Sequence, residues 1–206
     1  MKRKTKIRAL FIDIGGVLLT DGWSHEGAIE LARKFGLDAE ALNHRHSQAL
    51  ETYELGKLNM DQFLDLVVFD VKRPFTGAQF ARSLYDQSEA FPQMITMVKE
   101  LKEKFGLKIV VVSNEGRGLN EFRIKKFKLT SFVDSFISSC YVCLRKPDID
   151  IFRLALETNQ VSKDQVVYID NTQMFVQIAE IMGIRSVLHV DYHSTRVQLA
   201  SYGLKK

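Results

Sequence analysis

Cysteine, proline and long apolar runs are scarce in this sequence. Cys140 and Cys143 are the only cysteines among 206 residues, too few for a disulfide framework. Three prolines and no low-complexity stretch argue against a long disordered segment. No apolar run approaches the length of a membrane span, and Asp13 interrupts the apolar run behind the basic start, which argues against a signal peptide. We therefore expect a folded cytoplasmic protein that does not act on membranes.

An excess of one charge is also missing from most of the chain. The formal net charge is +4, from 29 basic and 25 acidic residues. Five of the basic residues lie at the start: Lys2, Arg3, Lys4, Lys6 and Arg8. The remainder is therefore close to neutral, and a nucleic-acid partner is not expected because no basic face continues into the folded part.

Short apolar runs alternate with amphipathic segments over much of the sequence. Runs at 8–14, 107–112, 136–142, 165–169 and 185–189 have the length and composition of buried strands. Amphipathic helices are predicted at 91–105, 149–158 and 172–182. This alternation predicts an α/β fold of three layers, with a parallel sheet covered by helices on both faces.

Residues 21–88 break the alternation. They contain four helical patterns and no convincing strand, and the second pattern covers about 38–55. Asn59 is a plausible N-terminal cap of the third. We therefore predict an α/β core made of 1–20 and 89–206, with 21–88 as a small inserted helical cap over the carboxyl edge of the sheet.

Polar side chains follow the predicted strands. Ligands of open α/β sheets bind beyond the carboxyl ends of the strands, so these side chains are the candidates for chemistry. They are Asp13, Ser113, Asn114, Lys146, Asp170 and Asn171. We expect them to form one site, although they lie dozens of residues apart in the sequence.

This set suits phosphoryl transfer. Asp13 is the candidate nucleophile, and Lys146 would neutralise the charge on it and on the transferring group. Ser113 and Asn114 would hold phosphate oxygens, with Gly15 and Gly16 allowing a sharp turn close to the substrate. Mg²⁺ is the expected cofactor, held by Asp13, Asp170 and the backbone at Gly15.

Four segments resemble the motifs of haloacid dehalogenase-like hydrolases and follow one another in the same order. They are FIDIGGVL at 11–18, VVSN at 111–114, RKP at 145–147 and VYIDN at 167–171. YELGKL at 53–58 also looks like part of the helical cap in one subfamily. The resemblance implies a Rossmann-like core with a four-helix cap, Mg²⁺ dependence and phosphatase activity on a small phosphorylated metabolite. It leaves open whether the protein is a monomer or a homodimer.

The sequence departs from that family pattern at two places. The family phosphatases carry a second Asp, as general acid and base, where this sequence has Gly15. An Asp is common at the position of Asn171, and an Asn near Phe175. These departures keep two alternatives open: a regulatory module with a degraded site, and a 2-haloacid dehalogenase. Asp170 argues against the dehalogenase, because a carboxylate there suits a cation better than an anionic haloacid.

Other polar residues have simpler interpretations. Cys140 and Cys143 read as buried structural residues of a strand, and His44 and His46 as polar positions of a cap helix. Trp23 either lines the substrate entrance or packs at the hinge. Arg117 lies either near a phosphate or on a flexible surface turn.

Overall fold

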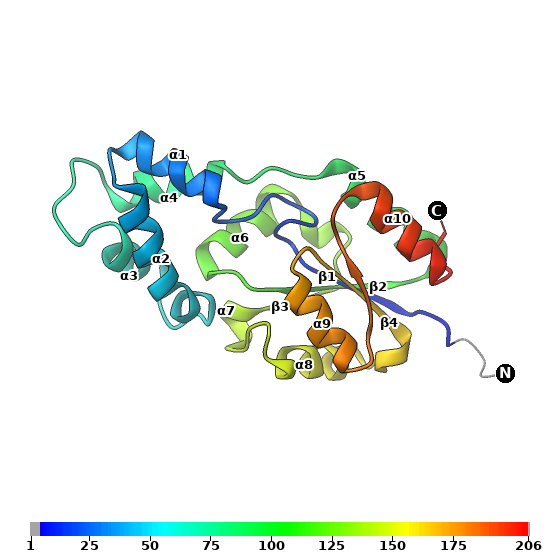
Figure 1. The fold of residues 1–206 in the computed structure, drawn as a ribbon. Helices are drawn as coiled ribbons and strands as arrows, with labels where there is room; N and C mark the ends of the chain where they lie inside the picture. Colours follow the sequence, from blue (N-terminus) through cyan, green and yellow to red (C-terminus); the bar gives the residue numbers. More distant parts are fainter. Residues whose placement is uncertain (1–4, 206) are drawn as a thin grey trace.

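A five-stranded parallel sheet forms the centre of the computed structural model, which describes residues 5–205 (Figure 1). Its strand order is β3-β2-β1-β4-β5. The strands are β1 (Ala9–Ile12), β2 (Lys108–Ser113), β3 (Ser135–Ser138), β4 (Val166–Asp170) and β5 (Arg185–Leu188). Every residue of β1 is buried, because the strand lies between β2 and β4 and both of its faces are covered.

Helices cover both faces of the sheet. Leu10 and Ile12 of β1 face an apolar cluster that includes residues of α5 (Pro92–Phe105) and α10 (Tyr192–Ser201), with α6 (Arg117–Lys126) beside it. Phe11 points to the opposite face, where α8 (Ile149–Asn159) and α9 (Gln173–Ile181) pack. This alternation of side chains along a strand produces the three layers, and the predicted α/β fold class is confirmed.

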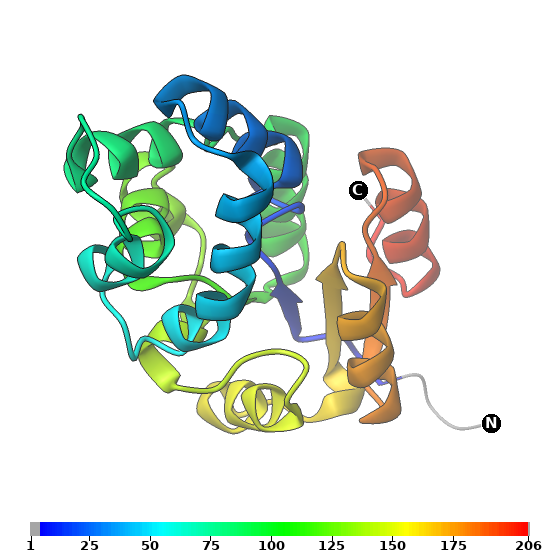
Figure 2. The same cartoon turned by 60° about the vertical axis from the view of Figure 1, so that its left-hand side comes forward.

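Four further helices follow β1 and gather beside the sheet in both views (Figures 1 and 2). They are α1 (His25–Phe35), α2 (Ala39–Glu54), α3 (Met60–Val67) and α4 (Gly77–Asp86). Asn59 caps α3 as predicted, because its side chain accepts a hydrogen bond from Gln62 N. The four helices surround an apolar cluster of their own, which includes Phe63 and Phe80.

Two chain segments connect these four helices to the sheet, and they lie side by side. Thr20 N donates to Glu89 O at 2.9 Å, and Phe91 N donates to Leu18 O at 2.9 Å. These contacts hold together the segment that leaves β1 for α1 and the segment that returns from α4 to α5. The division into two domains itself remains a prediction.

The strand predicted at 136–142 is too long. β3 ends at Ser138, opposite Ser113, where β2 also ends, so no neighbouring strand remains for further pairing. A short helix α7 (Ser139–Val142) follows instead. Cys140 is buried in it, but Cys143 is exposed, so the expectation of two buried cysteines is wrong for Cys143.

The prediction that Arg117 lies on a flexible surface turn is also wrong, because Arg117 is the first residue of α6. That helix buries Asn120 and Arg123 beside Leu119, and this polar buried face hides its amphipathic pattern. No helix in the described part of the chain is long and apolar enough to cross a membrane. The basic residues at positions 2–4 lie outside the described residues.

Candidate active site

The strand order places three of the predicted site residues next to one another. Asp13 follows the central strand β1, Ser113 ends β2 on one side, and Asp170 ends β4 on the other. Lys146, from the loop before α8, reaches the same point. Its Nζ lies 3.0 Å from Asp13 Oδ2 and 2.7 Å from Asp170 Oδ2. The four side chains that the sequence places at strand ends therefore meet at the carboxyl edge of the sheet.

Burial and hydrogen bonds fix this cluster. Lys146 and Asp170 are fully buried, whereas Asp13 is 9% exposed and lines a cavity. Asp170 accepts hydrogen bonds from the Tyr168 hydroxyl and, at 2.7 Å, from Thr172 N. Asp13 is thus the carboxylate that a substrate in the cavity can reach, and Asp170 lies behind it.

Charge within the cluster is unbalanced. Burial raises the pKa of Asp13 to about 7, Asp170 adds to the rise, and Lys146 and the Ser113 hydroxyl oppose it. Burial alone would lower the pKa of Lys146, but the Asp13 and Asp170 carboxylates hold it above its usual value. Two carboxylates around one ammonium leave a surplus negative charge when both are ionised, which a bound cation would relieve.

The donor set fits Mg²⁺. Asp13 and Asp170 would supply hard oxygen ligands, and the backbone carbonyl of Gly15 is the predicted third. Among residues 5–205, no three His, Cys, Asp or Glu side chains are grouped so as to hold a metal. Asn171 stands where a third carboxylate is common, so the remaining protein ligands must be backbone or amide oxygens.

The loop after Asp13 requires glycine at position 16. Gly16 has φ of 67°, and a Cβ atom there would lie 2.0 Å from Asn171 Nδ2. A Cβ atom on Gly15 would lie 3.3 Å from Asp21 Oδ1. The Asp21 carboxylate, six residues further along the chain, therefore lies where a side chain at position 15 would project. Asp21 could not be identified from the sequence, because only the folded loop brings it there.

Asn114 lines the cavity and also holds the loop that carries Lys146. Its Nδ2 donates to Lys146 O at 2.8 Å, and its Oδ1 accepts from Lys146 N at 2.8 Å. One of the two Nδ2 hydrogens is therefore engaged with the backbone of that loop. The binding of phosphate oxygens by Asn114 or by nearby backbone N–H groups stays a prediction.

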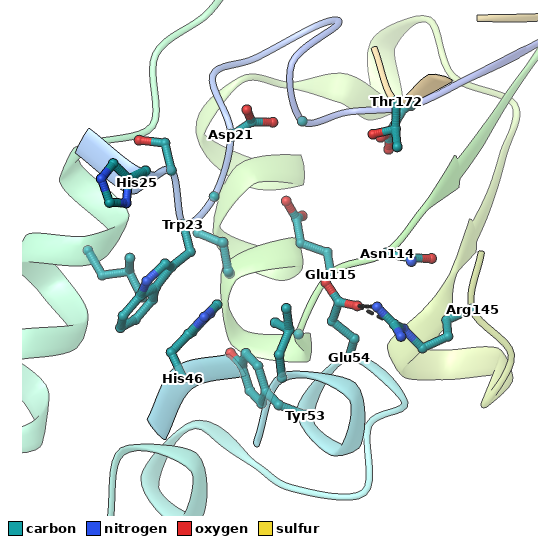
Figure 3. Close-up of a pocket in the computed structure, with 18 of the residues that line it drawn as sticks. Asp21, Trp23, His25, His46, Tyr53, Glu54, Asn114, Glu115, Arg145 and Thr172 are labelled. Carbon is teal, nitrogen blue, oxygen red and sulfur yellow. Dashed lines mark hydrogen bonds and ion pairs between the residues drawn. The ribbon is translucent and has the colours of Figure 1, made fainter. Parts of the chain in front are cut away.

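Asp13 is one of the residues that line a cavity of about 520 Å³. Figure 3 shows other side chains of this lining. Trp23, His46 and Tyr53 line the cavity from one side, and Asn114 and Arg145 from the side of the sheet. Trp23 lines the cavity and stacks on His46 with ring centroids 4.2 Å apart, and it also contacts Phe63. Of the two predicted positions, this is the one facing the substrate. His44 is exposed as predicted, but His46 turns inward, and burial lowers its pKa to about 4.

Two ion pairs that the sequence does not reveal surround this cavity. Arg145 Nη2 lies 2.7 Å from Glu54 Oε2, which joins α2 to the loop before Lys146. Arg123 is fully buried and pairs with Glu115 at 2.5 Å. Arg123 also donates to Ser88 Oγ at 3.1 Å and to Thr20 O at 2.9 Å, and so binds both connecting segments.

Arg117 does not lie near the expected phosphate site, which was one of the two positions predicted for it. Its Nη2 donates to Cys140 O at 3.3 Å, and its guanidinium stacks over the Tyr141 ring at 4.7 Å. Its role in the structure is to join the start of α6 to α7.

Comparison with known proteins shows the family of this chain. The family model described as haloacid dehalogenase-like hydrolase matches residues 40–189. The chain therefore belongs to the haloacid dehalogenase-like hydrolases, and its Rossmann-like α/β fold is the one that the resemblance implied.

The relatives that match this chain include a fungal cyclase and a bacterial enzyme of known structure. Drimenol cyclase drtB of Aspergillus calidoustus is 26% identical over 190 residues, which are 88% of this chain and 34% of that protein. The chain thus spans about a third of that relative's length. A HAD family enzyme of Bacteroides thetaiotaomicron, bt-2542, was solved with magnesium and inorganic phosphate; it superposes with a TM-score of 0.73 at 19% identity, covering 88% of this chain and 93% of that one.

The L-2-haloacid dehalogenase RSc1362 superposes with a TM-score of 0.64 at 21% identity, covering 88% of this chain and 86% of that one. Identities this low establish the shared fold alone. The reaction must therefore be argued from the residues of the site.

Proposed function

We propose that this protein is a Mg²⁺-dependent phosphatase that acts in the cytoplasm on a small phosphorylated metabolite. The observation that carries the proposal is the cluster of Asp13, Lys146 and Asp170, in which two carboxylates share one buried ammonium beside a cavity. A surplus negative charge of this kind suits a site that binds a cation together with a phosphate ester.

Asp13 performs the nucleophilic step. Its carboxylate oxygen forms a bond to phosphorus while the ester P–O bond breaks, and the alcohol leaves with a proton. Water then attacks phosphorus, so that inorganic phosphate departs and the Asp13 carboxylate is restored. Lys146 and Ser113 hold the charge that develops on the transferring group. Asp13, Asp170 and the Gly15 carbonyl would hold Mg²⁺, which would reduce the repulsion between nucleophile and substrate.

Asp21 is our candidate for the general acid and base that Gly15 cannot provide. Its carboxylate lies beside the position that a side chain at residue 15 would occupy. Asp21 is exposed to solvent, but partial desolvation by its neighbours raises the pKa of its carboxyl group, and Arg123 and a hydrogen bond with Asn171 oppose the rise. A carboxyl group that retains its proton more readily is suited to protonating the departing alcohol.

Phosphate release from a broad panel of phosphate monoesters, with Mg²⁺ and with EDTA, tests the proposal. We expect turnover that needs Mg²⁺ and is lost in Asp13→Asn. Halide release from 2-haloacids that is insensitive to EDTA would instead support the dehalogenase. Mg²⁺ binding without turnover of any ester would support the regulatory module. The cyclase named for the fungal relative is outside this proposal, because the chain spans a third of that protein.

A further inference from the structure

The wall of the cavity opposite Asp13 is aromatic and preformed. Trp23 stacks on His46 at 4.2 Å, and Tyr53 stacks on Phe63 at 4.2 Å with the rings 18° apart. Tyr53 and Phe63 are 5% and 1% exposed, so packing within the four helices already fixes them. A substrate group entering this space meets the half-buried rings of Trp23 and His46, which the buried rings behind them hold in place and which need no reordering.

The charges that line the cavity are mostly negative. Beyond Asp13 and the proposed acid Asp21, its lining carboxylates are Glu26, Glu54 and Glu115. Among the described lining residues, Arg145 is the only lysine or arginine, and Glu54 already pairs with it at 2.7 Å. The histidines of the lining are His25 and His46, and the His46 ring is neutral at pH 7 because burial lowers its pKa.

The buried cations behind the lining are occupied as well. Lys146 contacts both Asp13 and Asp170, and Arg123 pairs with Glu115. A second anionic group on a substrate would therefore lose its water shell beside carboxylates and would find no unpaired lysine or arginine in the lining.

We propose that this cavity selects phosphate monoesters of uncharged alcohols with an aromatic or apolar body, and rejects esters that carry a second anionic group. This inference rests on the proposed phosphatase function and adds the class of its substrate. The aromatic wall binds the alcohol part, and the lining carboxylates exclude sugar bisphosphates and phosphorylated carboxylic acids by repulsion.

The test compares benzyl phosphate with 4-carboxybenzyl phosphate. The methylene group insulates the ester oxygen from the ring substituent, so the two alcohols are similar leaving groups. We expect kcat/KM for benzyl phosphate to be at least about tenfold higher, the order of effect for one like charge in a partly buried site. Equal values, or a preference for the carboxylated ester, would overturn the inference.

Glu54→Gln tests whether the charge of the lining, rather than the shape of the cavity, causes the preference. It removes a lining carboxylate and frees the Arg145 guanidinium, so the preference for benzyl phosphate should shrink by about three- to tenfold. Glu51→Gln is the matched control. Glu51 lies 3.9 Å from the same guanidinium but is 70% exposed and outside the cavity lining, so the ratio should change less than about twofold. An unchanged ratio in Glu54→Gln would overturn the charge argument.

Turnover of 4-nitrophenyl phosphate shows whether the protein is a phosphatase at all, independently of the substrate class inferred here. Turnover of this ester without the expected preference would refute the substrate class alone. No turnover of any of the three esters with Mg²⁺ would refute the phosphatase itself and the inference with it.

Discussion

Replacing Lys146 by methionine removes an ammonium group that two buried carboxylates share. Its Nζ lies 3.0 Å from Asp13 Oδ2 and 2.7 Å from Asp170 Oδ2, and the Lys146 side chain is fully buried. Removing one partner from a buried ionic cluster costs about 3–5 kcal/mol, because the remaining charge is left without compensation. Since Asp13 can take up a proton, we expect a loss near the lower end, about 3 kcal/mol, in the free energy of unfolding at pH 7 in EDTA.

Urea unfolding measures this loss, and two comparisons make it specific. Lys102→Met removes a lysine with the same 2.7 Å contact, to Asp134, but the Lys102 and Asp134 side chains are 29% and 41% exposed. That variant should lose only about 0–1 kcal/mol. Adding Asp170→Asn to Lys146→Met removes one of the two stranded carboxylates, so the double variant should regain at least about half of the loss.

Mg²⁺ provides a third comparison. If Mg²⁺ binds beside Asp13 and Asp170, it should stabilise both the wild type and Lys146→Met against unfolding. For a Kd of about 1 mM, the free energy of unfolding should rise by about 1.4 kcal/mol at about 10 mM Mg²⁺. Unfolding of Lys146→Met within about 1 kcal/mol of the wild type in EDTA would refute the electrostatic reasoning. Absence of any Mg²⁺ effect on the wild type would refute the metal assignment.

Three further predictions concern the same region. Asp21→Asn should lower kcat about 10²-fold for benzyl phosphate but less than about tenfold for 4-nitrophenyl phosphate, whose leaving group needs little protonation; equal losses would exclude Asp21 as the acid. The pKa of His46 is lowered by burial to about 4, from 6.5. Its contribution to stability is therefore present above pH 6.5 and is lost as the pH falls toward 4. Between pH 7 and pH 5 the wild type should lose about 1–2 kcal/mol more than His46→Phe in urea unfolding, and parallel losses would contradict the assignment. Calorimetry should show Mg²⁺ binding to the wild type and none to Asp170→Asn; retained binding would place the metal elsewhere.

The sheet and the strand-end residues could be predicted from the sequence because each has a local signal. β1 is an uninterrupted apolar run, and Gly106, in the left-handed conformation, ends α5 where the pattern predicted a helix end. Parallel strands then bring their carboxyl ends to one edge, which places Asp13, Ser113 and Asp170 together. α10 was missed, since its sequence has almost no amphipathic pattern.

The cavity wall could not be predicted in the same way. His46 and Trp23 lie 23 residues apart in the sequence, and they stack only because α2 packs beside the segment that precedes α1. The Glu54–Arg145 pair likewise depends on how α2 docks against the loop before α8. Helical periodicity gives the buried face of each helix, but it does not show which part of that face meets the sheet.

Trapping of a phosphorylated enzyme tests the central claim most directly. If Asp13 attacks phosphorus, acid quenching during turnover followed by borohydride reduction should convert Asp13 to homoserine, which mass spectrometry of its peptide detects, and the same treatment without substrate should not. Direct attack of water on phosphorus would leave Asp13 unchanged at every quench time. Phosphate released at an undiminished rate by Asp13→Asn would likewise show that Asp13 is not the nucleophile.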